Sequence, residues 1–204
     1  MWVLDWFWFI LPAIIANMSP VIIKAKLENS RLFIGIFVAL CALSLLFGRY
    51  GYDEISLSLL LMLLGVTLLY SKKYNWPIDF KMKSVDGNRI LGDGKTMFGF
   101  LIGVICGTLV GIIQGRAVLG FLLSLGTMVG DSIGSFIKRR LRVKQGKNAP
   151  LIDDTIFVIV AFFFVYPFYS FPFYYLPLSV VAAPILHKIA NIFAHKVKLK
   201  EVPW

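Results

Sequence analysis

The sequence predicts an all-α integral membrane protein, a polytopic helical bundle of about seven transmembrane helices in one domain, residues 1–204. Hydrophobic residues make up 58% of its 204 residues, and the mean hydropathy is +0.79. That composition is too apolar for a water-soluble domain of this size. Apolar runs also recur along the chain at close to the ~20 residues that a bilayer requires. Finally, the basic residues almost avoid every second loop between these runs, as in multi-pass membrane proteins.

The candidate spans are the seven apolar runs at about 2–23, 32–48, 55–71, 97–115, 117–137, 155–169 and 174–195. The first run lacks the basic start of a secretory signal and is rich in Trp and Phe. These features indicate a retained span with aromatic residues at the membrane interface. The second and third runs are the shortest, and they form one candidate hairpin, 32–71.

The basic residues predict how these spans are oriented. All 21 Lys and Arg residues except Arg49 and Arg116 fall on one side when the loops are assigned alternately to the two membrane faces. Positively charged loops stay in the cytoplasm. We therefore expect a multi-pass protein of the cell (plasma) membrane with its N-terminus outside and its C-terminus inside. The polar stretches 72–96 and 138–154 then share the cytoplasmic face and can form one site together.

Glycines at every fourth position mark the two spans in the middle of the chain. The first set is Gly99, Gly103, Gly107, Gly111 and Gly115, and the second is Gly126, Gly130 and Gly134. Glycines at this spacing line one helix face and let helix backbones approach closely in lipid. Because a short turn joins the spans 97–115 and 117–137, we expect them to pack against each other as antiparallel neighbours. This close packing would also fix the direction of Asp131.

The first cytoplasmic loop contains a glycine-rich stretch that invites comparison with a nucleotide-binding P-loop. The comparison fails because Arg89 occupies the position of a required glycine and no strand precedes the segment. Exposed backbone N–H groups, the charge of Lys95 and the positive start of a helix at Thr96 still favour anion binding. The candidates are Asp93, Gly94, Lys95 and Thr96. A turn that leads into an N-capped helix is the alternative interpretation.

The stretch from Gly130 to Asp154 combines a basic cluster with carboxylates at a membrane face. Its basic residues are Lys138, Arg139, Arg140, Arg142, Lys144 and Lys147. Such a cluster can hold phosphates, whereas Asp131, Asp153 and Asp154 are hard oxygen ligands of the kind that Mg²⁺ prefers. An acid inside an apolar run is costly and predicts a functional site. A basic loop that only sets topology is the alternative, but it would need no carboxylates.

Polar residues also occur in the first and last spans. Asn17 and Ser19 precede Pro20, which could simply end the helix. His187 and Asn191 are four residues apart and share a helix face, where a structural histidine is the more common explanation.

These motifs together resemble those of the CDP-archaeol synthases, a branch of the CDP-diglyceride synthetase superfamily. The matching blocks are Pro12-Ala13 with Ala16 to Pro20; Pro77 to Asp79 with Asp86-Gly87 and Arg89 to Thr96; Gly130-Asp131 through Ser135 and Lys138 to Arg140 as far as Pro150 and Asp153; and Pro184, His187, Asn191 and Val202 to Trp204. Two departures stand out. The pair of runs at 32–71 resembles an insertion into a five-span core, and Ile156 stands where the family usually has a second carboxylate, a role that Asp154 could take over.

The resemblance implies transfer of a cytidylyl group from CTP to an isoprenoid ether lipid phosphate, 2,3-di-O-geranylgeranylglyceryl phosphate, with Mg²⁺ as cofactor. The catalytic residues would be Asp131, Lys138, Arg139 and Asp153. The nucleotide would contact Asp93, Gly94, Lys95, Thr96, Lys138, Arg139 and Lys144. The metal ligands would be Asp131, Asp153 and Asp154. The residues for the lipid phosphate, or for support of the site, would be Asn17, Ser19, Ser135, Arg140, His187 and Asn191.

Three other functions fit these sequence features less well. A CTP-dependent polyprenol kinase would use the same nucleotide but would need a base, and a transporter of phosphorylated solutes would place its site near mid-membrane. The net charge of +10 does not indicate nucleic-acid binding, because no folded polar module carries it. The expected partners are CTP, the lipid phosphate and membrane lipids, and a homo-oligomer is compatible with these features.

Overall fold

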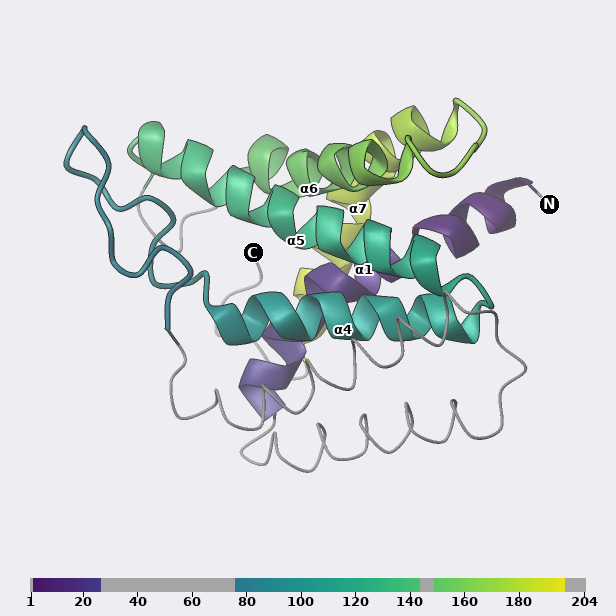
Figure 1. Ribbon diagram of the computed structural model, residues 1–204, viewed down its shortest axis with the longest axis horizontal. Coiled ribbons are helices and arrows are strands. Elements are labelled where there is room, and N and C mark those ends of the chain that lie inside the picture. The colour runs from purple at the N-terminus through teal and green to yellow at the C-terminus, as the bar shows by residue number, and fades with distance from the viewer. Residues whose placement is uncertain (1, 27–75, 144–148, 197–204) are drawn as a thin grey trace.

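The computed structural model describes residues 2–26, 76–143 and 149–196, which form a bundle of five helices (Figure 1). They are α1 (Trp2–Lys26), α4 (Met97–Ile113), α5 (Ala117–Arg140), α6 (Pro150–Val165) and α7 (Tyr175–Lys196). These helices correspond to five of the seven predicted spans, and the described residues form no strand beyond two isolated bridges. The predicted spans 32–48 and 55–71, and with them the hairpin 32–71, lie outside the described residues.

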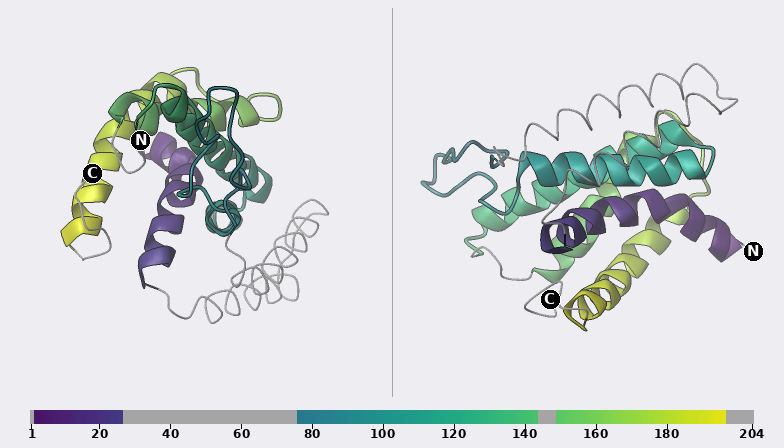
Figure 2. Two further views of the ribbon diagram at one scale, coloured as in Figure 1. Left: turned by 90° about the vertical axis from the view of Figure 1, so that its left-hand side faces the viewer. Right: turned by 90° about the horizontal axis from the view of Figure 1, so that it is seen from below.

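The chain order places α4, α5 and α6 side by side, each antiparallel to the next. A tight turn at Gln114–Arg116 connects α4 to α5, and α5 packs along α6 (Figure 1). The first helix, α1, crosses this layer and packs against α4 and α5, while α7 packs against α6 and part of α1 (Figure 2). The helix ends at residues 96, 140 and 150 therefore meet at one end of the bundle.

The helices extend further than the hydropathy of the sequence suggests. The last turn of α5 contains Lys138, Arg139 and Arg140, and the first turn of α6 contains Asp153. Much of the predicted loop 138–154 is therefore helical. Basic side chains are stabilised at a helix C-terminus and acidic ones at an N-terminus, and Pro150 at the start of α6 suits the first helical position.

The first helix continues through Pro20 to Lys26, so a helix end at Pro20 is not what the structure shows. Proline removes one backbone hydrogen bond, but neighbouring helices in a membrane bundle can support such a position. Gly99 of α4 lies beside Pro20, which places this turn of α1 against the start of α4.

The first glycine set packs against α5, as predicted, and also against α1, which was not predicted. A Cβ at Gly107 would lie 2.5 Å from the carbonyl oxygen of Pro12 in α1, and one at Gly111 would lie 2.5 Å from Cα of Gly120 in α5. These glycines therefore let α4 approach both α1 and α5. Gly115 lies outside this face, in the turn, where its φ of +69° explains the need for glycine.

The second glycine set packs against a different helix from the predicted one. A Cβ at Gly126 would lie 2.7 Å from Cα of Ala161, and one at Gly130 would lie 2.6 Å from Cα of Phe157. Both contacts are with α6, so these glycines bring α5 close to α6 rather than to α4. The prediction was wrong because spacing identifies a close-packed face but does not identify its partner.

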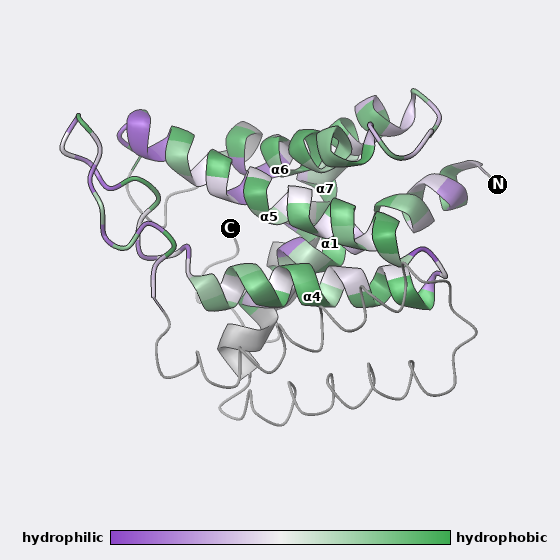
Figure 3. Cartoon of the chain, in the orientation of Figure 1, coloured by the Kyte–Doolittle hydropathy of each residue, from purple (hydrophilic) through white to green (hydrophobic). Residues whose placement is uncertain are grey.

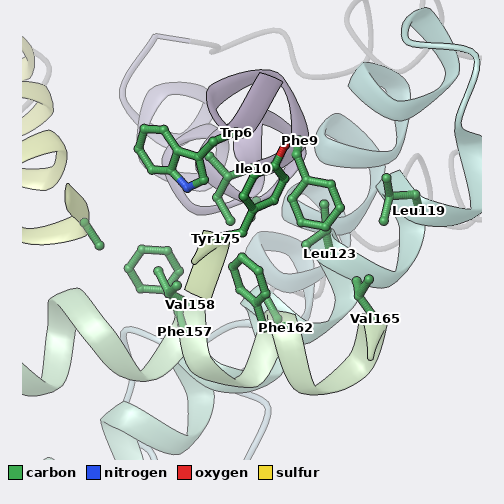
Figure 4. Packing of buried hydrophobic residues seen from close by; sticks show 13 residues of the cluster. Trp6, Phe9, Ile10, Leu119, Leu123, Phe157, Val158, Phe162, Val165 and Tyr175 are labelled. Carbon is green, nitrogen blue, oxygen red and sulfur yellow. The ribbon is translucent and has the colours of Figure 1, made fainter. Parts of the chain in front are cut away.

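An aromatic core fills the space between α1, α5, α6 and α7 (Figure 4). Phe9 packs against Phe162 and Tyr175 at ring-centroid distances of 5.7 and 5.2 Å. The indole N–H of Trp6 donates a 2.7 Å hydrogen bond to the Ser179 hydroxyl, so the polar edge of this buried ring is satisfied. This core fixes α1 and α7 relative to the antiparallel layer.

The outer surface of the helices is apolar, and hydrophilic residues gather at one end (Figure 3). Within the described residues, Trp2–Val21 and Ala117–Arg140 are long and apolar enough to cross a membrane, and Met97–Ile113 and Tyr175–Leu186 are shorter apolar helices. Large side chains such as Phe163 and Val181 are exposed on this surface. A surface of this kind suits lipid better than water.

Candidate active site at the charged end of the bundle

Three parts of the chain meet where the hydrophilic residues gather: residues 76–96 (the 76–96 segment), the last turns of α5 and the first turn of α6 (Figures 1 and 3). We call this region the charged end. Five ion pairs lie here in the described part of the chain, and each joins a Lys or Arg to an Asp. Apolar helix surface adjoins it directly, so the charges lie where a bundle of this kind would leave the membrane.

The 76–96 segment is a loop whose two ends lie side by side and whose tip is a tight turn. Its two ends are joined because the Ile78 amide donates to the Lys95 carbonyl and the Met97 amide donates to the Trp76 carbonyl. Its tip is closed by a hydrogen bond of 2.8 Å from the Ser84 amide to the Asn88 carbonyl. The positive φ values of Gly87 and Gly92 supply the turns.

Asp79 organises the interior of this segment. Its buried carboxylate accepts hydrogen bonds from Nε and Nη2 of Arg89 at 3.2 and 2.7 Å, and from the backbone amides of Lys81, Leu91 and Gly92. Burial raises the pKa of this carboxyl, but the Arg89 guanidinium and the three amides outweigh burial and hold the pKa well below its usual range. Asp79 is therefore ionised and structural at neutral pH.

The end of the segment delivers Lys95 and Thr96 to the start of α4. The Thr96 hydroxyl accepts a hydrogen bond of 3.2 Å from the Gly99 amide, so Thr96 is the N-cap of α4, as the alternative interpretation of the sequence expected. Lys95 turns towards α5, where its ammonium group contacts the Asp131 carboxylate. The loop cation and the helix acid thus meet although they are 36 residues apart.

A second lysine and carboxylate pair lies between α5 and α6. Nζ of Lys138 is 2.6 Å from Oδ1 of Asp153, and the two side chains are only 14% and 18% exposed. The other oxygen of Asp153 accepts a hydrogen bond of 3.0 Å from the Ala149 amide, which caps the start of α6. The pair therefore ties the end of α5 to the start of α6.

The two arginines next to Lys138 contact the protein itself. Nη1 of Arg139 donates to the Val143 carbonyl at 2.8 Å and so closes the turn after α5. Arg140 donates to Asp86 and to backbone carbonyls of the 76–96 segment. The pKa of Asp86 is lowered, first by the hydrogen bond from the Asn88 side chain and also by the charge of Arg140.

The predicted magnesium ligands are not gathered into one cluster. Within the described residues, no three acidic, histidine or cysteine side chains are grouped as a metal site would need. Asp131 and Asp153 each face a lysine, and Asp154 is buried at 8% exposure. Mg²⁺ in nucleotide sites is typically held by one or two carboxylates together with substrate phosphates and water. Two separate carboxylates beside lysines would fit that kind of site.

The remaining predicted residues that the structure describes lie on α1, α5 and α7 and in the 76–96 segment. The Ser19 hydroxyl donates to the Ala16 carbonyl within α1, and Ser135 is buried on α5. Asp93 pairs with Arg89 at 2.8 Å, and Gly94 follows it at the exposed surface of the segment. His187 and Asn191 are on α7, and Lys144 lies outside the described residues.

An apolar groove lies between α1, α6 and α7. Ile10, Ile14, Val158 and Ala183 are among its lining residues. Asn17 is its polar residue on the α1 side, and Phe157 is one turn beyond Asp153 along α6. The groove therefore lies in the apolar part of the bundle, and its Phe157 wall is one turn from the charged end.

A helical bundle with an apolar outer surface and a charged end indicates an integral membrane protein. Comparisons with known proteins specify the class further. A family model described as CDP-archaeol synthase, CarS-like, matches residues 71–204. The chain belongs to this family.

Individual relatives support that assignment. The CDP-archaeol synthase of Pyrococcus horikoshii is 49% identical over 140 residues, covering 63% of this chain and 82% of that protein. The CDP-archaeol synthase of Pyrococcus furiosus is 35% identical over 213 residues, covering 99% and 98%. A solved structure of an intramembrane enzyme for archaeal membrane lipid biosynthesis aligns with a TM-score of 0.60 and 28% identity, covering 93% of this chain and 94% of that one.

Proposed function

We propose that this protein transfers the cytidylyl group of CTP to 2,3-di-O-geranylgeranylglyceryl phosphate, forming unsaturated CDP-archaeol and pyrophosphate. The observation that carries the proposal is the pair of lysine and carboxylate contacts, Lys95 with Asp131 and Lys138 with Asp153, beside an apolar groove. Cations suit the phosphates of both substrates, and the groove suits an isoprenoid chain. Membership of the CDP-archaeol synthase family supports CDP-archaeol as the product.

The reaction needs positioning and charge neutralisation more than proton transfer. An oxygen of the lipid phosphate attacks the α-phosphorus of CTP, and the bond from that phosphorus to the oxygen bridging to the β-phosphorus breaks. The attacking oxygen is already anionic at neutral pH, so no general base is required. The protein must hold two mutually repelling anions in line and stabilise the charge that develops on pyrophosphate.

The lysines are suited to this task because each can change partner. In the present arrangement, the ammonium groups of Lys95 and Lys138 neutralise carboxylates. Phosphate oxygens are equally good acceptors for them, so both can turn to the triphosphate with only side-chain rotation. Lys95 directly precedes Thr96, the N-cap of α4, and the positive end of the helix dipole favours an anion near that position.

The carboxylates that the lysines leave would then be free to hold Mg²⁺ together with the nucleotide phosphates. Asp131 and Asp153 are the residues for this role, and Asp154, next to Asp153 at the start of α6, is the third candidate. Magnesium would supply charge neutralisation on the leaving pyrophosphate. The residues of the chain provide the rest, because α5 and α6 fix the directions of the two carboxylates.

The lipid substrate would enter from the membrane along the groove between α1, α6 and α7. Its isoprenoid chain would contact residues such as Ile14 and Val158, and its phosphate would emerge near Asn17. In this arrangement the isoprenoid chain of the lipid substrate would stay in the apolar groove, and its phosphate would meet CTP at the charged end. We place this end at the cytoplasmic face of the cell membrane, where CTP is available.

The test is incubation of purified protein with labelled CTP, the diether lipid phosphate and Mg²⁺, followed by lipid extraction. We expect label in a CDP-lipid and stoichiometric release of pyrophosphate, with both lost after chelation of the metal. Release of CDP with formation of a lipid monophosphate from polyprenol would instead indicate a kinase. Uptake of phosphorylated solutes into proteoliposomes without CTP turnover would indicate a transporter.

A further inference from the structure

Arg140 is the last residue of α5, and its guanidinium group reaches the tip of the 76–96 segment. Nη1 lies 2.6 Å from Oδ1 of Asp86, and Nη2 lies 2.6 Å from the Arg89 carbonyl oxygen and 3.5 Å from that of Asn88. The guanidinium carbon is 5.1 Å from the ring centroid of Phe136, one turn earlier on α5. The guanidinium group of Arg140 thus stacks over an aromatic ring, and both of its terminal nitrogens bind the segment.

These contacts differ in kind from those of the neighbouring lysines. Lys95 and Lys138 contact carboxylates, which can exchange an ammonium for a metal ion. Arg140 instead binds a backbone carbonyl and a carboxylate at the same time, in a planar fork that fits both. A phosphate could replace Asp86 but could not take the place of the carbonyl acceptor without releasing the segment.

Arg140 is also the attachment of this tip to the helices. Among the described residues, it supplies the hydrogen bonds that join positions 84–90 to a helix. The same stretch contains Arg89, whose side chain binds Asp79 and Asp93. Holding the Arg89 carbonyl therefore fixes the interior of the segment, and through it the position of Lys95.

We propose that Arg140 is a positioning residue, which anchors the 76–96 segment to α5 so that Lys95 stays in reach of the substrate phosphates after it leaves Asp131. The proposal rests on the proposed function for the identity of those phosphates. Before substrate binds, Lys95 and Arg140 are two attachments of the segment to α5, at positions 131 and 140. When phosphate draws Lys95 away, Arg140 remains, because its acceptors belong to the segment itself.

The first measurement is backbone hydrogen exchange in the ligand-free protein, comparing wild type with Arg140→Gln and Arg139→Gln. We expect exchange of the amides of residues 84–92 to rise about tenfold or more in Arg140→Gln, as the loss of charge-assisted hydrogen bonds implies. Exchange in α4 and α5 should not change. Arg139→Gln is the matched control, because among the described residues its guanidinium bonds the turn after α5 and not the 76–96 segment, so residues 84–92 should exchange as in wild type.

The second measurement is steady-state kinetics with CTP. Arg140→Gln should raise KM for CTP about tenfold and lower kcat by a smaller factor, because the groups that contact the nucleotide remain but are less well placed. Arg140→Lys should recover part of the loss. Asp86→Asn weakens one of the contacts of Arg140 but leaves Arg140 itself unchanged. It should show a smaller change in the same direction.

Two results would overturn the proposal. One is unchanged exchange of residues 84–92 in ligand-free Arg140→Gln together with weakened CTP binding, which would make Arg140 a direct phosphate ligand. The other is wild-type exchange and kinetics in both Asp86→Asn and Arg140→Lys, which also decides the matter if Arg140→Gln does not fold. If the wild-type protein formed no CDP-lipid, the proposed function would fail, whereas the exchange comparison would still show whether Arg140 anchors the segment.

Discussion

At the scale of single residues, the charged end is balanced in a way that prepares it for a charged substrate. Lys95 and Lys138 each neutralise one carboxylate, so neither charge is left alone at the edge of an apolar bundle. An unpaired buried charge would be costly, and an exposed pair would contribute little. These partly buried pairs lie between the two cases, and in the proposed function a magnesium nucleotide would take the place of both partners.

The first prediction concerns Asp131. Asp131→Asn should lower kcat/KM roughly 100-fold or more, because the neutral amide can neither hold a cation nor balance Lys95 when the nucleotide is absent. The measurement is CDP-lipid formation over a range of Mg²⁺ concentrations. Asp5→Asn is the matched control, since Asp5 lies at the opposite end of the bundle beside Arg116. A wild-type rate for Asp131→Asn at limiting Mg²⁺ would remove Asp131 from the site.

The second prediction concerns the contribution of Asp79 to protein stability and how it depends on pH. Its folded-state pKa is depressed, so it stabilises the protein above its unfolded pKa of about 3.9, and this contribution is lost as the pH falls towards the folded value. Asp79→Asn should cost about 2–3 kcal/mol at neutral pH, because it weakens a buried, charge-assisted network.

The measurement is thermal unfolding in detergent for wild type and Asp79→Asn across a pH series. The stability difference between the two proteins should be constant above about pH 5 and should shrink below about pH 4. Other carboxylates titrate in both proteins, so the difference isolates Asp79. A difference that stays the same down to pH 2 would contradict the assignment.

Residue types at the site were predictable from the sequence, but their partners were not. Lys95, Asp131, Lys138 and Asp153 are charged residues beside apolar runs, and that pattern alone marks them as functional candidates. Asp79 gave no comparable signal of its central position. Its donors come from residues 2 to 13 positions later, through turns whose geometry no local pattern reveals.

At the scale of helices, the α5–α6 contact decides where both carboxylates of the site lie. Gly126 and Gly130 bring the two backbones together, and Asp131 follows directly on α5. Asp153 lies one turn before Phe157, which Gly130 contacts. A change in this interface therefore moves the two carboxylates relative to each other.

The third prediction compares two glycines of the same helix. Gly130→Ala should destabilise the protein by about 1–3 kcal/mol and reduce activity further, because the new methyl group would meet the Phe157 backbone. Gly134→Ala is the matched control. Its Cβ would lie 3.5 Å from the Ile152 carbonyl oxygen, an ordinary contact, and alanine favours helix by about 1 kcal/mol.

Thermal unfolding and CDP-lipid formation, measured for both variants, check this prediction. Gly134→Ala should match or exceed wild type in stability, and Gly130→Ala should lose both stability and rate. Equal stability of the two variants would show that α5 and α6 are not packed as closely as described.

Helix positions were predictable from apolar run length, and the antiparallel packing of the spans 97–115 and 117–137 was predicted correctly. Helix ends and the partner of the second glycine set were not predictable. The runs at 97–115 and 117–137 correspond to α4 and α5, but α5 continues to Arg140 because charged residues can extend a helix beyond the membrane. The glycine spacing predicted close packing correctly. Which helix fills the glycine face depends on how α1 and α6 are placed, and those placements are set by the aromatic core far along the chain.

At the scale of the whole molecule, the two ends of the bundle differ in their residues. The charged end carries the 76–96 segment, and the opposite end carries the turn at Gly115 and the aromatic connection between α6 and α7. The charge pattern predicts that the charged end is cytoplasmic. This orientation would place the reaction on the side of the membrane that contains CTP.

The fourth prediction tests this orientation with single cysteines. Val85 is fully exposed at the tip of the 76–96 segment, and Phe173 is 87% exposed at the opposite end, so each can be replaced by cysteine with little loss of packing. Cys41 and Cys106 are first replaced by alanine. In intact cells, a membrane-impermeant maleimide should label Phe173→Cys and spare Val85→Cys, because only the aromatic connection faces outwards. In inverted vesicles the pattern should reverse, while CTP added from outside should be turned over only by the inverted vesicles. Labelling of Val85→Cys in intact cells would place the charged end outside, and a cytoplasmic nucleotide could then not be its substrate.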